Sequence, residues 1–114
     1  MTAEIKSTIS LEEFQKADLR IGTIVSADDL EESNKLIKLQ VDIGTERRQV
    51  IAGIKKKYKI EDLVGKQVLI IANLEPKNLA GYESHGMLLC ATNEESLPIF
   101  LAPESAVADG AGVK

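Results

Sequence analysis

The sequence predicts an all-β fold, and three observations support this prediction. Val and Ile lead the apolar runs, and β-branched residues favour strands. Residues 37–43 alternate strictly between apolar and polar side chains, as a half-buried strand does. The elements follow the order strand, strand, strand, helix, strand, strand. With 114 residues, 44% of them hydrophobic, the chain has the length and apolar content of one domain with one core.

The first element is a short helix over residues 9–17, preceded by a flexible segment over residues 1–8. Ser10 and Glu13 have the spacing of a capping box, in which each side chain accepts a hydrogen bond from the other residue's backbone amide. Leu11 and Phe14 then fall on one side of the helix. This apolar stripe either covers one end of the sheet or packs against a second subunit.

Three strands follow within residues 18–54. In "DLRIGTIVSA" the apolar period shifts at Gly22 and Thr23, which indicates a β-bulge where the strand bends. "KLIKLQVDIG" is the alternating strand, Gly44 and Thr45 form a turn, and "RRQVIAGI" returns as the third strand of the sheet.

The remaining elements complete a barrel over residues 18–91. "KKKYKIEDLVGK" breaks the strand pattern and predicts one or two helical turns anchored by Tyr58 and Leu63. "QVLIIANL" is expected to be a strand buried on both faces, and "GMLLCA" the fifth strand. "LPIFLAPE" and "AVADGAGVK" are expected as short strand extensions beyond the main sheet. Three strands, a helix and two strands form the plan of a five-stranded OB-fold barrel.

Composition excludes several classes of function. No run approaches the roughly 20 apolar residues of a membrane span, and the N-terminus lacks the pattern of a signal peptide, so we expect a cytoplasmic protein with no membrane partner. Cys90 is expected to be an inert core thiol, and one Cys with one His supplies too few ligands for structural zinc. We find no phosphate-binding loop or catalytic triad and expect no cofactor, metal or catalysis.

The charge distribution is compatible with a surface that binds polyanions. The net charge is −4, yet residues 35–81 carry ten basic and five acidic residues, while the flanking segments are acidic. Polyanion binding follows the local field rather than the total charge. Solvated lysines explain the same distribution equally well.

Several segments resemble one known family: "DLRIGTI", "NLEPKNLAG", "SHGMLLCA" and the closing "IFLAPESA" and "GAGVK". Over residues 9–114 the chain resembles the tRNA-binding domain at the C-terminus of bacterial methionyl-tRNA synthetases. The same module occurs as free-standing tRNA-binding proteins and in eukaryotic synthetase cofactors.

The resemblance implies an OB fold and a non-catalytic module that binds tRNA with little sequence specificity. It also implies a homodimer formed through the N-terminal helix and the C-terminal residues 92–114. As part or subunit of methionyl-tRNA synthetase, the module would raise the enzyme's tRNA affinity beside the catalytic part. The alternatives are a free-standing tRNA-binding protein and a protein–protein interaction or chaperone-like module.

Basic residues near the second and third strands are the first candidates for tRNA contacts. Lys35 and Lys38 lie on the sheet surface that OB barrels offer to nucleic acids. Arg47 and Arg48 point to opposite faces of one strand, so at most one contributes fully, and Arg48 is the candidate chosen. Lys55 is a weaker candidate. Asp42 and Glu46 beside these arginines suggest a structural ion pair instead of acid–base chemistry.

The segment from Asn73 to Met87 supplies the other candidates. Asn73 and Lys77 flank Pro76, whose fixed φ shapes a turn, and their side chains can hold a phosphate or ribose. Asn73 equally suits a role in satisfying turn amides. The resemblance places Ser84 and Met87 on the binding face, whereas the residues alone favour Met87 as a core residue.

Overall fold

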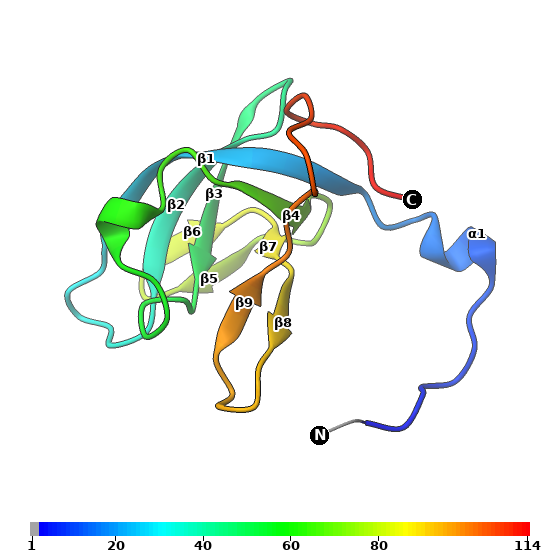
Figure 1. Cartoon of the computed structure of the whole chain (residues 1–114), viewed down its shortest axis with the longest axis horizontal. Coiled ribbons are helices and arrows are strands. Elements are labelled where there is room, and N and C mark those ends of the chain that lie inside the picture. The colour runs from blue at the N-terminus through cyan, green and yellow to red at the C-terminus, as the bar shows by residue number, and fades with distance from the viewer. Residues whose placement is uncertain (1–2) are drawn as a thin grey trace.

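The computed structural model describes residues 3–114 and confirms the five-stranded antiparallel barrel, which is nearly closed and OB-like (Figure 1). The strands pair in the order β3-β2-β1-β4-β7. The elements in chain order are α1 (Leu11–Phe14), β1 (Leu19–Asp29), β2 (Ile37–Asp42), β3 (Arg47–Ala52), the 3-10 helix η1 (Ile60–Asp62), β4 (Gln67–Ile71), β5 (Lys77–Leu79), β6 (Tyr82–Ser84), β7 (Met87–Leu88), β8 (Cys90–Thr92) and β9 (Pro98–Phe100).

The core lies inside the barrel and follows the predicted alternation. Ile37, Leu39 and Val41 of β2 are fully buried, and Leu39 lies opposite the buried Val50 of β3. β4 differs from the prediction, because only Val68 and Ile70 are fully buried while its other residues are half-buried. One face of β4 therefore points into the barrel, and the other is only partly covered.

The long strand β1 bends at Val25, three residues after the predicted bulge at Gly22. Its pairing with β2 shifts register between Ile24 and Ser26. Gly22 serves a different purpose, because a Cβ atom there would lie 2.6 Å from Val41 Cγ1 and 2.8 Å from the Asp42 carbonyl oxygen. The glycine lets β1 and β2 approach closely.

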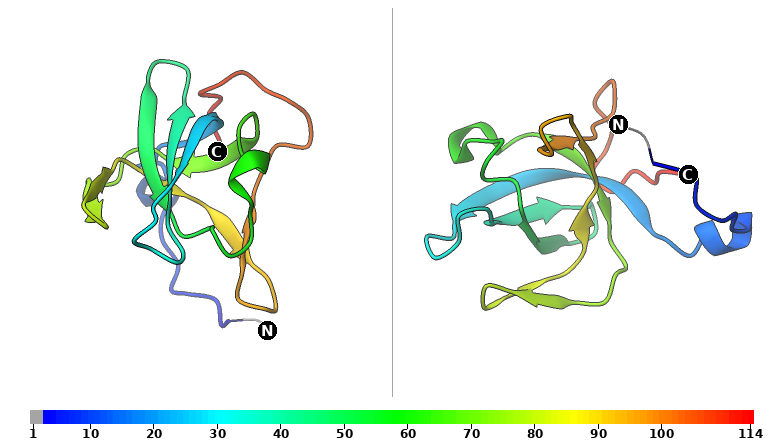
Figure 2. Two further views of the ribbon diagram at one scale, coloured as in Figure 1. Left: turned by 90° about the vertical axis from the view of Figure 1, so that its left-hand side faces the viewer. Right: turned by 90° about the horizontal axis from the view of Figure 1, so that it is seen from below.

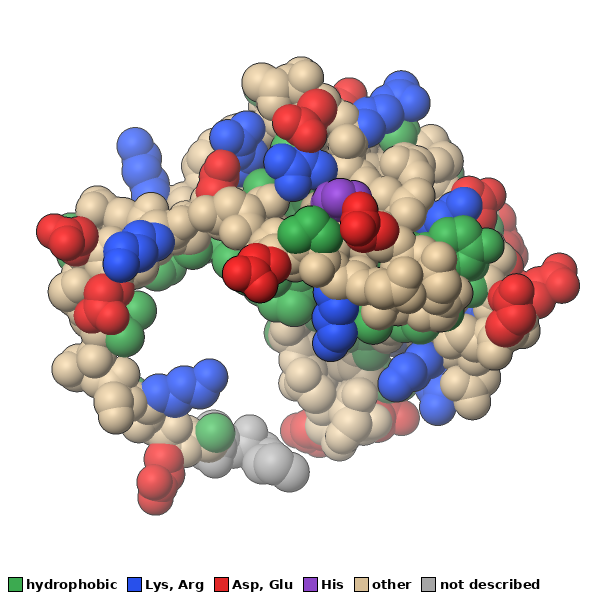
Figure 3. All heavy atoms as spheres, turned by 180° about the vertical axis from the view of Figure 1, so that it is seen from behind, with side chains coloured by type: hydrophobic (Ala, Val, Ile, Leu, Met, Phe, Trp, Pro, Cys, Tyr) green, Lys and Arg blue, Asp and Glu red, His purple; other side chains and the backbone are tan. Residues whose placement is uncertain are grey.

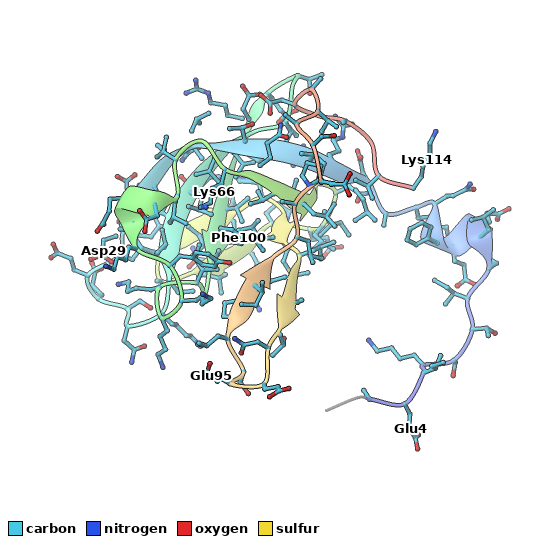
Figure 4. The ribbon with its side chains drawn as sticks, in the orientation of Figure 1. Glu4, Asp29, Lys66, Glu95, Phe100 and Lys114 are labelled. Atoms are coloured by element: carbon cyan, nitrogen blue, oxygen red, sulfur yellow. The ribbon has the colours of Figure 1, made fainter. Side chains whose placement is uncertain are left out.

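The N-terminal helix α1 is shorter than predicted and stands away from the barrel (Figures 1 and 2). Its capping box is present: Ser10 Oγ accepts from the Glu13 amide at 3.0 Å, and Glu13 Oε1 accepts from the Ser10 amide at 3.1 Å. No residue of α1 is buried. Figure 4 labels Glu4 on the same outlying segment. Residues 1–2, part of the segment expected to be flexible, lie outside the described residues.

The predicted helical turns between strands three and four are η1, with Leu63 fully buried next to it. Tyr58 stacks on Phe100 of β9, with ring centroids 4.0 Å apart and planes inclined by 6°. Figure 4 labels Phe100, which packs against the core from β9. Both predicted anchors, Tyr58 and Leu63, therefore hold this segment against the barrel.

The predicted fifth strand is divided into two. β7 pairs with β4 in the main sheet, whereas β8 pairs with β9 in a separate hairpin. Gly86 precedes β7 with φ of +116°, a conformation that favours glycine, and a Cβ atom there would lie 2.9 Å from the Ile71 carbonyl oxygen. Glycine is therefore required at position 86 by the backbone geometry.

The last residues were expected beyond the main sheet, yet they run along β1. The Ile21 amide donates to the Ala111 carbonyl at 2.9 Å, and the Val113 amide donates to the Leu19 carbonyl at 2.9 Å. Arg20 and Gly112 form an antiparallel bridge. The C-terminal segment occupies the side of Leu19–Ile21 that β2 does not reach.

Candidate nucleic-acid interface

The β5–β6 hairpin lies outside the main sheet, against the edge strand β3 (Figure 2). Three hydrogen bonds join β6 to β3: Gln49 Nε2 donates to the Glu83 carbonyl at 2.9 Å, the His85 amide donates to the Gln49 carbonyl at 2.7 Å, and the Ile51 amide donates to Ser84 Oγ at 3.0 Å. The hairpin is therefore fixed to the barrel.

The hairpin and the outward side chains of β2 and β3 form one surface. Lys38 Nζ of β2 lies 4.8 Å from the ring centroid of Tyr82 in β6. Gln40 donates to Gln49 across β2 and β3 at 3.1 Å. We call this surface the hairpin face and define it by Lys38, Gln40, Arg47, Gln49, Lys77 and Tyr82.

The register of β2 and β3 separates the two neighbouring arginines. Arg47 lies opposite Asp42, on the side of the outward-facing residues, and is exposed. Arg48 lies opposite the buried Val41, at the end of the inner face. Its Nη1 donates to the Ala72 carbonyl at 2.9 Å, and its Nε donates to Glu46 at 2.8 Å. The expected ion pair thus joins Glu46 to Arg48, while Asp42 accepts from the Gly44 amide at 2.8 Å.

Asn73 lies at the same end of the barrel as Arg48, and its side-chain amide is used within the fold. Its Oδ1 accepts from the Asp18 amide at 2.8 Å, and its Nδ2 donates to the Lys16 carbonyl at 2.6 Å. Its partners are thus backbone groups before β1 and not the amides of its own turn. These bonds join the start of β1 to the loop after β4.

An ion pair stabilises the start of β1. The guanidinium of Arg20 donates to both Asp18 carboxylate oxygens, at 2.8 and 2.9 Å. The hydrogen bond from Arg20 lowers the pKa of Asp18 and raises the pKa of Arg20 itself, and Arg48 further favours the charged Asp18 carboxylate. Two arginines and two carboxylates thus balance each other at this end of the barrel, beyond the hairpin face.

Ser84 and Met87 lie on either side of Gly86 and differ in exposure. Ser84 is buried, and its hydroxyl donates to the Gly86 carbonyl at 3.2 Å while accepting from the Ile51 amide. Met87 is 48% exposed, and Leu88 next to it is the buried residue of β7. The thioether is therefore available at the surface.

Lys35 and Lys55 lie at the loop between β1 and β2. Lys55 Nζ donates to the Leu30 and Ser33 carbonyls and to Asp29, and its backbone amide donates to the Lys35 carbonyl at 3.1 Å. The Lys55 ammonium is thereby bound to loop oxygens, whereas Lys35 is exposed. Figure 4 labels Asp29 beside this loop.

The fold brings together four of the predicted site residues: Lys38, Lys77, Ser84 and Met87. Lys77 pairs with Ser84 in the hairpin and is exposed. Lys35 lies near the hairpin tip, since Asn34, Leu36 and Ala80 line one surface depression. Arg48 and Asn73 lie at the far end of the barrel, and Lys55 lies under the loop.

Tyr82 lies on the hairpin face, and sequence reasoning did not single it out. The only available signal was its place between two predicted contacts, Lys77 and Ser84, in a chain with few aromatic residues. On the surface seen in Figure 3, the single histidine lies among basic, acidic and hydrophobic side chains. His85 Nε2 lies 2.7 Å from Glu83 Oε1, so an acidic residue adjoins the hairpin.

Among residues 3–114, no helix is long and apolar enough to cross a membrane. Within the same range, no three His, Cys, Asp or Glu side chains are grouped closely enough to hold a metal ion.

Comparison with known proteins identifies related sequences and structures. Residues 19–111 match the family model described as "Putative tRNA binding domain". The chain is 47% identical over 107 residues to methionine–tRNA ligase of Protochlamydia amoebophila, covering 90% of this chain and 15% of that enzyme. The chain thus spans about a sixth of the curated relatives it matches, with 16% of the Chlorobium chlorochromatii ligase as a second example.

Solved structures also resemble this chain over nearly its whole length, and two of them serve as examples. A MetRS-related protein from Pyrococcus horikoshii is 34% identical with a TM-score of 0.89, over 96% of this chain and 100% of that one. The chaperone CsaA from Bacillus anthracis is 31% identical with a TM-score of 0.86, over 95% and 100% of the two chains.

Proposed function

The chain belongs to the tRNA-binding domain family, and we propose that it binds tRNA through the hairpin face without catalysing a reaction itself. The observation that supports this most directly is that Lys38 of β2 lies over Tyr82 of the β5–β6 hairpin, which also carries Lys77. Lysines that neutralise phosphates release counterions, which gives salt-dependent binding with little sequence preference.

The proposed contacts divide into direct and positioning residues. Lys38 and Lys77 of the hairpin face contact phosphates, together with Lys35 near the hairpin tip, and the exposed Met87 beyond β6 packs on a base or ribose. Ser84 holds the hairpin on β3, Lys55 holds the loop that carries Lys35, and Arg48 and Asn73 hold the loop after β4. These positioning residues act through hydrogen bonds within the protein, so they shape the surface without touching the RNA.

We further propose that the module operates in the cytoplasm as part or subunit of methionyl-tRNA synthetase. Its relatives named methionine–tRNA ligase are about six times longer than the segment matched. A second contact surface tethered to a catalytic part makes its own binding step intramolecular, so weak binding still raises the total affinity for tRNA.

We propose a homodimer in which α1 of each protomer packs on the partner. Ile9 and Leu11 are 63% and 69% exposed, which is unfavourable for large apolar side chains that remain in water. An apolar groove of about 450 Å³, with Ile21, Leu69 and Leu101 among its lining residues, lies along the C-terminal segment. The exposed stripe of α1 and this groove are complementary in chemistry.

Titration of labelled whole tRNA by fluorescence anisotropy, at two salt concentrations, tests the main proposal. We expect binding at low salt that weakens steeply as salt rises. The Lys35→Ala/Lys77→Ala variant should lose binding and keep the wild-type oligomeric state. The Lys59→Ala/Lys66→Ala variant removes the same charge outside the hairpin face and should bind as the wild type does. Absence of wild-type binding at low salt would overturn the proposal.

Binding of unfolded polypeptides is a second candidate function, favoured by the similarity to the chaperone CsaA. The same titration with a labelled, permanently unfolded polypeptide discriminates between the two. Polypeptide binding without tRNA binding would favour the chaperone-like function.

A further inference from the structure

The aromatic residues of this chain leave one ring on the hairpin face. The sequence contains two Tyr and two Phe. Tyr58 and Phe100 stack on each other against the core, and Phe14 lies on α1, away from the barrel. Tyr82 is therefore the aromatic residue available for stacking beside the basic side chains of β2 and β5.

Tyr82 sits on a rigid support. It occupies β6 directly before Glu83, whose carbonyl accepts from Gln49, and two residues before Ser84, whose hydroxyl is bonded to β3. Tyr82 and Ser84 point to the same side of β6, and Lys77 and Leu79 lie opposite them in β5. The half-buried ring thus faces the outer surface of β2. The hydrogen bonds of β6 to β3 hold it in this position before any ligand binds.

The cation over this ring is the ammonium of Lys38, which has no acidic partner among residues 3–114. Lys38 lies directly opposite Asp28 in the register of β1 and β2, yet in residues 3–114 Lys38 forms no ion pair, and its ammonium lies over Tyr82. A lysine held at a ring by a cation–π contact remains free to meet a phosphate. An aromatic face and a cation are the two groups that bind a single-stranded nucleotide.

We infer that Tyr82 and Lys38 form a binding site for one unpaired nucleotide of the tRNA, with the base stacked on the face of the Tyr82 ring opposite Lys38 and a neighbouring phosphate at the Lys38 ammonium. This inference rests on the proposed function and adds to it a preference for RNA with unpaired bases. Bases inside a duplex cannot reach the ring, so the site distinguishes RNA with accessible loops or ends from a continuous helix.

The test combines affinity with a signal from the ring. Protein labelled with 3-fluorotyrosine gives two ¹⁹F resonances, and the Tyr58→Phe variant identifies that of Tyr82. Whole tRNA should shift the Tyr82 resonance, whereas a blunt RNA duplex with the same number of phosphates should leave it in place. The variants Tyr82→Leu and Tyr82→Phe separate stacking from the hydroxyl, because phenylalanine retains the ring.

Tyr82→Leu should weaken tRNA binding on the order of tenfold and leave duplex binding unchanged, while Tyr82→Phe should bind within about twofold of the wild type. Far-UV circular dichroism and urea unfolding confirm that each variant is folded. Equal affinity of Tyr82→Leu and wild type for tRNA would overturn this inference and leave the proposed function intact. Failure of the wild type to bind tRNA at low salt would overturn both.

Discussion

The hydroxyl of Ser84 lies 3.0 Å from the backbone nitrogen of Ile51, and this hydrogen bond fixes the β5–β6 hairpin to β3. Both residues are buried, so neither group has water as a replacement partner. β3 is an edge strand of the sheet, so its outward amides have no neighbouring strand in that sheet to bond. The Ser84 hydroxyl supplies a partner for one of them.

Replacing Ser84 by Ala should lower the free energy of unfolding by about 1–3 kcal/mol, because the buried Ile51 amide loses its partner. Urea unfolding followed by circular dichroism measures the loss. Ser105→Ala, at an exposed position, is the matched control and should change stability by less than about 0.5 kcal/mol. Equal stabilities for the two variants would contradict this role of Ser84.

Lys77→Ala should reduce the salt dependence of tRNA binding. If Lys77 neutralises one phosphate, its loss lowers the slope of log K against log salt by about 0.7–1 and weakens binding to all tRNAs alike. Anisotropy titrations at several salt concentrations measure the slope. Lys66→Ala removes the same charge at an exposed position before β4, and its slope should equal that of the wild type. An unchanged slope for Lys77→Ala would remove Lys77 from the interface.

Lys55→Ala should open the loop between β1 and β2. Its ammonium contacts oxygens of Asp29, Leu30 and Ser33, and a charged hydrogen-bond anchor contributes about 1.5–3 kcal/mol. Losing even 1.4 kcal/mol increases the open population about tenfold, so a glutamate-specific protease should cut after Glu31 or Glu32 correspondingly faster. The exposed neighbour Lys56→Ala is the control. Equal cleavage rates for both variants would show that the Lys55 ammonium does not hold the loop.

Cys90 should react slowly with iodoacetamide. Burial raises the pKa of its thiol, so at pH 8 less thiolate is present in the folded chain than in the unfolded chain. As pH rises, alkylation of the folded protein should therefore increase through a midpoint above that of the same protein in urea. Mass spectrometry of timed samples measures both rates. A folded-state midpoint below the unfolded one would contradict the burial argument.

The barrel could be predicted from the sequence because its strands carry a clear signal. Alternation over residues 37–43 determined which side chains of β2 are buried, and Tyr58 and Leu63 marked the helical connection correctly. The β5–β6 hairpin could not be predicted, because its strands are only three residues long, half of their residues are exposed and they have no apolar period. The pairing of residues 111–113 with β1 uses backbone groups, which any sequence of this length could supply.

Sequence reasoning selected the candidate residues by their chemical type, and it could not tell which of their polar groups are already bonded within the fold. Lys35, Lys38 and Lys77 are at or near the surface that was expected to bind tRNA. Asn73 and Lys55 have suitable chemistry as well, yet their polar atoms bond to backbone carbonyls and amides far away in the sequence. Such hydrogen bonds form between segments that are distant in the sequence and close in the fold. The periodicity and spacing of residues do not predict contacts of this kind.

Leu11→Asp should convert the proposed dimer to monomers. Leu11 is exposed in the protomer, so the change costs little within one chain. Burial of a leucine contributes about 1.5–3 kcal/mol, and a buried carboxylate adds a further penalty, so the dimer Kd should rise at least tenfold to hundredfold.

Leu101→Asp, in the groove along the C-terminal segment, should have the same effect because it alters the other side of the contact. Gln15→Glu adds the same charge on the N-terminal segment and serves as the control. Sedimentation velocity over a range of concentrations measures the equilibrium. A dimer that persists in both aspartate variants would show that the protomers associate through another surface.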